Sequence, residues 1–499
     1  MTPLPHILFD AEAEADLAAA EGTVIVFAAA DGTLTPAATA LDAAMGGALT
    51  RALAEPGVGG KPGVAESFGW PAGLAARRVL LACLGADPDA AAARKTGGAI
   101  AKALAKGPAT LATAGLGDEA PLADLVMALA LRLYDFRAYK KSKPAEGDEP
   151  EQGPRTIRVL SDRPEALAGG SRAMMALAEG VFFTRDLVNE PANVLTTDEF
   201  AARLAAMQEI GLDVEILGEP ELQTLGMRAL LGVGQGSASE TKVVVMRWMG
   251  GGQEAPFALV GKGVVFDTGG ISLKPASGME DMTMDMGGAG TVAGVMRTLA
   301  LRKARANVVG VVGLVENMPD GTAQRPGDIV RSMKGDTIEI INTDAEGRLL
   351  LADVLWYVQQ TFKPTGIVDL ATLTGAVIIA LGHHRAGYYA TDDALAADLE
   401  AACAATGDET WRLPLGKPYA EQLKSAKADL KNTGGRSAGS VTAAEFLHAF
   451  VEDGVPWIHI DIAGTATTSA GTDMAPKGAT GWGVAALDRL VRTRLEPEG

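Results

Sequence analysis

Apolar and polar positions alternate in blocks along the first third of the chain. The short apolar blocks, which we interpret as buried strands, cover residues 23–27, 78–82 and 109–115. Longer amphipathic or Ala-rich blocks predict helices over residues 37–53, 88–104 and 121–134. Strands and helices that alternate in this way are typical of an α/β domain.

The block pattern is interrupted at residues 140–154, which are charged, rich in Pro and Gly, and nearly free of apolar side chains. This composition predicts a flexible acidic loop. A strand is expected at residues 155–160, and a long helix from residue 164 to about 188 is expected to link two domains. We place the boundary near residue 170, so that residues 1–170 form an N-terminal α/β domain and residues 171–499 form a second, larger domain.

The second part of the chain is denser in strand signals. Apolar runs predict strands at residues 242–247, 257–260, 307–315, 337–341, 367–370 and 457–462. Helices are expected between them, notably at residues 288–301 and 348–361. Near-continuous apolar strands of this kind indicate a mixed, mostly parallel sheet that is covered by helices on both faces. A chain of 499 residues is in any case too long for one ordinary core.

Composition and charge narrow the class of protein. The hydrophobic content of 47% and charged content of 21% are those of a soluble globular protein. The formal net charge of −18 disfavours a nucleic-acid partner and an anionic membrane, because both require a basic surface. The two cysteines, Cys83 and Cys403, lie in small apolar surroundings, which suits a reducing compartment. The N-terminus lacks the pattern of a signal peptide, so we expect a cytoplasmic protein.

Two segments hold charged side chains between glycines and apolar residues. They read Gly261-Lys-Gly-Val-Val-Phe-Asp-Thr-Gly-Gly270 and Asn342-Thr-Asp-Ala-Glu-Gly-Arg-Leu349. The charged positions in and just after these segments are Lys262, Asp267, Lys274, Asp285, Asp344, Glu346 and Arg348. Buried charges are costly unless they are paired or bound to metal. Four converging carboxylates would repel one another, and one or two divalent ions would remove that conflict.

The expected local structure brings these charges to one edge of the sheet. Residues 257–266 read as a strand, with Asp267 in a turn beyond it, where such sheets bind ligands. Lys262 is expected to share a face of that strand with Val264. Asp344, Glu346 and Arg348 alternate, so they point the same way if their segment is extended. Each motif alone is better explained by turn or helix-start chemistry, but together they favour a metal site.

Oxygen-rich sites of this kind suit Mg, Mn or Zn. A lysine ligand must be neutral, and an adjacent divalent ion favours that form. Two ions about 3.5–4 Å apart can hold and activate a water molecule, and a neighbouring cation such as Lys274 can stabilise an oxyanion. The residues alone leave two classes open, a metal-assisted hydrolase and a phosphoesterase.

The other motifs are weaker indications of function. The segment Gly232-Val-Gly-Gln-Gly-Ser237 is not followed by Gly-Lys-Ser/Thr, and the Gly-rich segment at residues 287–294 has the wrong spacing for dinucleotide binding. We interpret both as packing or turn segments, and the pair His383-His384 as structural. The sequence contains no His-Glu-x-x-His, which argues against a single-zinc peptidase.

The two charged segments resemble the leucyl (cytosol) aminopeptidase family of two-metal exopeptidases. Asn342 to Leu349 matches that family's signature, and Gly261 to Gly270, continuing to Met284-Asp-Met286, matches its other metal segment. Further similarity occurs at residues 189–193, 369–376, 411–415, 429–432, 434–436 and 477–481. The resemblance covers residues from about 175 to about 485, and the first 170 residues match no motif of the family.

The resemblance implies a dinuclear metal-dependent aminopeptidase, a hydrolase that releases N-terminal amino acids from peptides by metal-activated water attack. It implies a preference for Leu and similar residues, two Mn²⁺ or Zn²⁺ ions per subunit, and a homo-hexamer. By motif position, Asp267 and Glu346 would bridge the metals, Asp344 would complete one shell, and Lys262 and Asp285 would complete the other.

The resemblance also implies the roles of the remaining site residues. Lys274 would polarise the peptide carbonyl, and Arg348 would bind a bicarbonate-like anion that moves a proton. The pocket for the first side chain would be lined by Met282, Thr372, Gly375 and Ala463. Two other hypotheses remain, a two-metal phosphoesterase and a non-catalytic binding protein of the same fold. Because all seven charged positions are present, the non-catalytic hypothesis is the weaker of the two.

Overall fold

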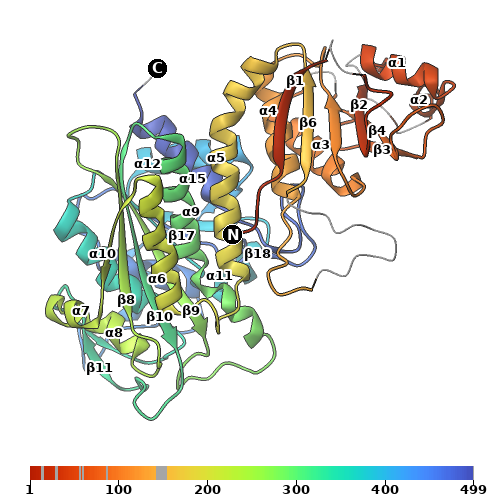
Figure 1. Cartoon of the computed structure of the whole chain (residues 1–499). Helices are drawn as coiled ribbons and strands as arrows, with labels where there is room; N and C mark the ends of the chain where they lie inside the picture. Colours follow the sequence, from red (N-terminus) through yellow and green to blue (C-terminus); the bar gives the residue numbers. More distant parts are fainter. Residues whose placement is uncertain are drawn as a thin grey trace. The chain divides into compact units, whose positions relative to one another are not determined.

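The computed structural model describes residues 1–12, 16–28, 32–55, 58, 61–85, 88–141 and 154–497 (Figure 1). Within it the chain forms two compact units. One contains Met1–Ala178 and Ser469–Lys477, and the other contains Glu179–Thr468 and Gly478–Gly499. Most of the predicted acidic loop, residues 142–153, lies outside the described residues.

The first unit is built on a six-stranded sheet of order β1-β6-β5-β2-β4-β3. The strands are β1 (His6–Ala11), β2 (Thr23–Ala28), β3 (Ala65–Gly69), β4 (Arg78–Cys83), β5 (Ala109–Ala112) and β6 (Thr156–Ser161). All neighbouring strands are parallel except β3, which runs antiparallel to β4. The four predicted strands are confirmed as β2, β4, β5 and β6. The pattern missed β1 and β3, because these edge strands are half-exposed and their apolar runs are at most three residues long.

The helices of this unit follow the predicted order. They are α1 (Pro36–Ala44), α2 (Ala48–Leu53), α3 (Ala90–Ala103) and α4 (Glu119–Arg132). The predicted helix over residues 37–53 is divided into α1 and α2, because Gly46 and Gly47 adopt φ values of 62° and 80°. The long helix expected from residue 164 is α5 (Pro164–Asn189), which begins in this unit and ends in the other.

The second unit is built on an eight-stranded mixed sheet of order β15-β14-β17-β13-β9-β10-β8-β7. Its strands are β7 (Asp213–Leu217), β8 (Lys242–Met249), β9 (Phe257–Asp267), β10 (Asn307–Asn317), β13 (Ile367–Ala371), β14 (Ala386–Ala390), β15 (Thr410–Arg412) and β17 (Trp457–Asp461). The central strands β17, β13, β9 and β10 are parallel, whereas β8 and β14 pair antiparallel with their inner neighbours. This confirms the mixed, mostly parallel sheet.

The remaining elements of the second unit surround this sheet. Its helices are α6 (Thr197–Ala205), η2 (Ala206–Ile210), α7 (Glu219–Leu225), α8 (Arg228–Gly234), η3 (Met279–Met286), α9 (Gly287–Arg302), α10 (Gly347–Phe362), α11 (Gly375–Leu381), α12 (Asp393–Thr406), α13 (Lys417–Ala420), η4 (Glu421–Leu423), α14 (Gly439–His448) and α15 (Val484–Leu495). Two small sheets consist of β11 (Ile329–Arg331), β12 (Thr337–Glu339) and β16 (Leu430–Lys431), and of β18 (Thr467–Thr468) and β19 (Gly478–Ala479). No described helix has the length and apolar character that a membrane crossing requires.

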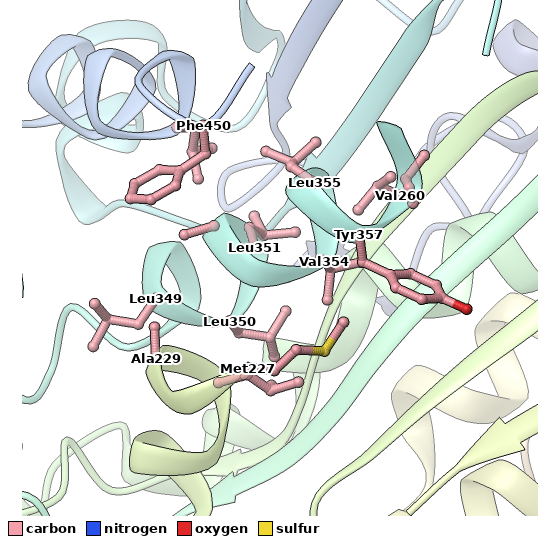
Figure 2. Packing of buried hydrophobic residues seen from close by; sticks show 14 of the residues in the cluster. Met227, Ala229, Val260, Leu349, Leu350, Leu351, Val354, Leu355, Tyr357 and Phe450 are labelled. Carbon is pink, nitrogen blue, oxygen red and sulfur yellow. The ribbon is translucent and has the colours of Figure 1, made fainter. Parts of the chain in front are cut away.

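Strand β9 shows how helices cover both faces of the sheet. A Cβ on Gly261 would lie 2.6 Å from the Cα of Ala289, so α9 packs directly on that face. Because side chains alternate along a strand, Val260 points to the opposite face. There Val260 belongs to the buried apolar cluster that holds Leu350 and Val354 of α10, and Figure 2 shows these side chains packed around α10. The strand that carries the charged residues is therefore held rigidly between two helices.

Candidate metal centre

The site is built where β9 and β10 end. Asp267 is the last residue of β9, and its partner in the register is Asn317, the last residue of β10. The side-chain amide of Asn317 donates a hydrogen bond to Oδ1 of Asp267 (2.7 Å) and another to the main-chain oxygen of Thr343 (3.1 Å). Asn317 thus joins the first charged segment to the second.

The second segment is a turn that leads into α10. The segment is not extended, so the condition under which Asp344, Glu346 and Arg348 would point the same way is not met. Glu346 adopts φ −79° and ψ −38° directly before the helix begins at Gly347. The turn is stabilised by the side chain of Asn342, whose Oδ1 accepts from the main-chain nitrogen of Asp344 (2.9 Å). Asp344 and Glu346 nevertheless meet Asp267, and the three residues offer carboxylate oxygens that lie within 4.8 Å of one another.

Lys262 lies beneath these carboxylates and is 2% exposed. Its Nζ contacts Oδ1 of Asp285 (2.8 Å) and Oε1 of Glu346 (2.9 Å), and it donates to the main-chain oxygen of Thr372 (2.9 Å). The start of α10 approaches Lys262 so closely that a Cβ on Gly347 would lie 2.6 Å from the lysine Cε. A side chain at position 347 would therefore force the end of Lys262 to move.

Lys274 and Asp285 complete the cluster. The Nζ of Lys274 contacts Oδ2 of Asp267 (2.7 Å) and also pairs with Oδ1 of Asp344. Asp285, near the end of η3, accepts the hydroxyl hydrogen bond of Thr372 at Oδ1 (2.8 Å). Its other oxygen, Oδ2, is buried and has no hydrogen-bond partner among the described residues.

The electrostatics of the cluster follow from its burial. Burial raises the pKa of Asp344 to about 6, although the charge of Lys274 opposes that shift. Burial also raises the pKa of Asp285 well above its usual range, against the opposing charge of Lys262. For Lys262, burial alone would lower the pKa, but the surrounding carboxylates, above all Asp285, raise it. Charge and proton occupancy are therefore tightly linked in this cluster.

The residues present fit a site for divalent cations. Four carboxylates share two lysines, so negative charge is in excess, and hard oxygen ligands are the donors that such cations prefer. The buried Oδ2 of Asp285 offers a further acceptor that the described residues do not use. The arrangement can hold metal and keep one cationic side chain, Lys274, beside it.

Arg348 extends the site on the α10 side. It is 7% exposed, and its Nη1 donates to the main-chain oxygen of Asn432 (2.8 Å). Its Nε is buried and lacks a hydrogen-bond partner among the described residues. Burial lowers the pKa of Arg348 to about 10, while the nearby charges of Glu346 and Asp461 oppose that shift. A buried guanidinium with an unused donor is chemically suited to an anion.

The four predicted pocket residues occupy two loops and two helices. Thr372, just after β13, contacts the cluster through its carbonyl and hydroxyl groups. Gly375 is the first residue of α11, and Ala463 follows β17, the strand beside β13. Met282 belongs to η3, the helix that also carries Asp285. Their role around a substrate side chain stays a prediction.

Sequence reasoning assigned no role to two polar residues that shape the site, Asn317 and Asn432. Asn432 is 0% exposed, and its Oδ1 accepts from the main-chain nitrogen of Ile341 (2.8 Å). Its Nδ2 donates to the main-chain oxygen of Asn342 (2.6 Å). Both asparagines lie next to short or ending strands, where one polar residue is an ordinary turn signal. Only the match at residues 429–432 could have directed attention to Asn432.

Comparison with protein families gives two matches. The family model described as "Cytosol aminopeptidase family, catalytic domain" matches residues 182–488. The model described as "Cytosol aminopeptidase family, N-terminal domain" matches residues 24–143, a region in which motif reasoning had found no similarity.

Similar proteins cover nearly the whole chain. A probable cytosol aminopeptidase of Cereibacter sphaeroides is 58% identical over 496 residues, which is 99% of each chain. One of Caulobacter vibrioides is 48% identical over 490 residues, covering 96% of this chain and 98% of the relative. Among solved structures, the bottromycin maturation enzyme BotP in complex with Mn is similar with a TM-score of 0.81 and 32% identity. That likeness covers 95% of this chain and 99% of the other.

Proposed function

The chain belongs to the cytosol aminopeptidase family, and on that basis we propose that it is a dinuclear aminopeptidase that removes Leu and similar N-terminal residues from peptides. Metal-dependent aminopeptidase activity is the property of the family. The finer proposal is supported by one observation above all: Lys262, Asp267, Asp344 and Glu346 gather in one buried cluster at the end of β9.

The residues divide naturally between two ions. Asp267 and Glu346 would hold both, Asp344 would complete one shell, and Lys262 with Asp285 would complete the other. When bound, the ions would polarise the substrate carbonyl and supply an activated water molecule. Lys262 would have to act as a neutral ligand. In the metal-free protein its positive charge balances the carboxylates of Asp285 and Glu346, and bound metal would take over that role.

The chain's own residues would orient and stabilise the reacting groups. Lys274 lies beside Asp267 and Asp344, so its ammonium would face the carbonyl oxygen of a bound peptide and stabilise charge that develops there. The free amino terminus of the peptide would bind at the metal site, which accounts for the removal of terminal rather than internal residues. Thr372, Gly375, Ala463 and Met282 would surround the first side chain.

Arg348 would bind a bicarbonate-like anion. The support is its unused, buried Nε together with the hydrogen bond that fixes its Nη1 to Asn432. The four nearby carboxylates are proposed as metal ligands, so none remains free as a general base. An anion held by Arg348 would carry the proton between the attacking water and the leaving amine.

The metal and the assembly are proposed by similarity. The related structure that contains Mn favours Mn²⁺, and Zn²⁺ fits the same donors. A homo-hexamer is proposed from the family resemblance. A cytoplasmic location is proposed from the name of the relatives.

The direct test is hydrolysis of leucyl-p-nitroanilide by the full chain. We expect a chelator to abolish release of nitroaniline, and added Mn²⁺ or Zn²⁺ to restore it. Asp285→Asn should lose activity and bound metal, whereas Asp281→Asn, an exposed position in the same helix η3, should retain both. Full activity after exhaustive removal of metal, or in Asp285→Asn, would contradict the proposed site.

A further inference from the structure

A buried carboxylate that takes no part in the proposed mechanism joins the ends of two central strands. Asp461 is the last residue of β17, is 1% exposed, and pairs in register with Ala371, the last residue of β13. Its Oδ1 accepts from the main-chain nitrogen of Leu373 (3.1 Å) and from that of Ala463 (3.2 Å). One side chain thus binds the loop after β13 and the loop after β17 together.

The shortest hydrogen bond that Asp461 accepts is at its other oxygen. Oδ2 accepts from the hydroxyl of Thr374 (2.6 Å), and Oδ1 also accepts from the main-chain nitrogen of that residue (3.4 Å). The same hydroxyl of Thr374 accepts from the main-chain nitrogen of Val377 (3.1 Å) and so caps α11. Asp461 therefore holds the hydroxyl that caps α11.

The loop after β13 is fixed from its other side by the acid cluster. The carbonyl of Thr372 accepts from Lys262 (2.9 Å), and its hydroxyl donates to Asp285 (2.8 Å). Residues 372–374 thus lie between the cluster and Asp461, with side-chain bonds at both ends. A small displacement at the Asp461 end would move this loop relative to the metal ligands.

We propose that Asp461 is a positioning residue that sets the preference for the first side chain of the peptide. It would do so by holding residues 372–375 and Ala463 at a fixed place beside the acid cluster. The inference rests on the proposed aminopeptidase function. Shape discrimination by one methylene in an apolar pocket amounts to about 10- to 200-fold in kcat/KM, so a loosened loop would reduce that ratio.

Asp461→Asn is the sharpest change, because the shape of the side chain is kept. Its remaining oxygen can still accept from the main-chain nitrogens, but its amide would face the Thr374 hydroxyl, which then lacks an acceptor. Thr374→Val removes the same bond from the other partner, together with the cap of α11 at Val377, and Thr374→Ser keeps both. A matched control is Asp392→Asn, which alters the carboxylate that caps α12 through Leu395 (2.7 Å), on a helix that carries no site residue.

The measurement is kcat/KM of the metal-loaded full chain on leucyl-, methionyl- and alanyl-p-nitroanilide, with bound metal determined in each sample. For Asp461→Asn and Thr374→Val we expect the Leu:Ala ratio of kcat/KM to fall by about 10-fold or more at unchanged metal content. Thr374→Ser and Asp392→Asn should keep the ratio within about twofold. Asp461 also interacts electrostatically with Arg348, but any resulting loss of rate is common to all substrates and cancels in the ratio.

An equal loss on every substrate, or an unchanged ratio in both variants, would overturn the inference and leave Asp461 as a purely structural carboxylate. If Asp461→Asn does not fold, the question is decided by comparing Thr374→Val with Thr374→Ser, which keeps both hydrogen bonds of that hydroxyl. A wild-type chain that cleaves none of the three anilides would instead contradict the proposed function itself.

Discussion

The guanidinium of Arg348 is hydrogen-bonded at Nη1, through a 2.8 Å bond to the main-chain oxygen of Asn432. The side chain of Asn432 meanwhile binds the main chain of Asn342 at both its oxygen and its amide group. One buried asparagine therefore fixes both the loop that carries the acids and the cation that follows them. The arrangement leaves Nε of Arg348 unused among the described groups.

Removal of the guanidinium should remove the response to bicarbonate. For Arg348→Met we expect kcat on leucyl-p-nitroanilide to fall about 100-fold or more, the usual contribution of an assisted proton transfer. The wild type, freed of dissolved carbonate, should be stimulated by added bicarbonate, whereas the variant should not respond. Arg348→Lys, which keeps a positive charge, serves as the control. Stimulation of Arg348→Met by bicarbonate would show that the anion binds elsewhere.

Loss of the Asn432 side chain should weaken metal binding. Groups that orient metal ligands typically contribute 10- to 100-fold in affinity or activity, so for Asn432→Ala we expect a decrease of about that size. Titration of the metal-free variant with Mn²⁺ measures it directly. The neighbouring Thr433→Ala removes a hydroxyl whose one hydrogen bond among the described residues is accepted from the main-chain nitrogen of Gly435 (3.2 Å). This variant should bind metal as the wild type does. Equal affinities in all three proteins would contradict this positioning role.

Substitutions of the two lysines should have different effects on activity and on bound metal. Lys274→Met should lower kcat by about 100- to 1,000-fold, the usual effect of losing one electrostatic stabiliser, while bound metal is retained. Lys262→Met should lose metal from the site, because it deletes a proposed ligand. Metal analysis and kinetics on the same samples separate the two outcomes. If both variants lost metal equally, Lys274 would have to be reassigned as a structural partner of Asp267 and Asp344.

A buried carboxylate away from the site should make stability depend on pH. Asp353 is 0% exposed and accepts from the main-chain nitrogens of Leu230 (3.0 Å) and Met333 (2.7 Å). Burial raises the pKa of Asp353 to about 7, against the opposing effect of these donors. Between about pH 4 and pH 7 the folded protein holds a proton here that the unfolded chain has released, so stability falls as pH rises.

Asp353→Asn should remove this dependence. We expect the unfolding free energy of the wild type, relative to that of the variant, to decrease by up to roughly 4 kcal/mol from pH 4 to pH 7. Denaturant unfolding of the metal-free proteins at a series of pH values measures the difference. Asp281→Asn, at an exposed position, controls for the general effect of charge. If the difference in unfolding free energy between the wild type and Asp353→Asn stayed constant or rose with pH, the raised pKa of Asp353 would be contradicted.

The sequence by itself determined the elements that carry the chemistry. The apolar run of β9 and the amphipathic block of α10 were predicted because they are buried among apolar neighbours, and burial leaves a local, periodic signal. The charged residues were found for the same reason, since charges within apolar flanks demand partners. The edge strands β1 and β3 were missed because half-exposed strands lack such a signal.

Tertiary structure alone decided which of these groups meet. The order β17-β13-β9-β10 brings Asp461, Thr372 and Asp267 to one edge of the sheet, although they are distant in sequence. The helical conformation of Glu346, which turns it toward Lys262, was set by where α10 begins and not by alternation along the segment. Local periodicity reports how deeply a residue is buried, whereas hydrogen-bond partners depend on strand order and loop closure, which no short stretch of sequence encodes.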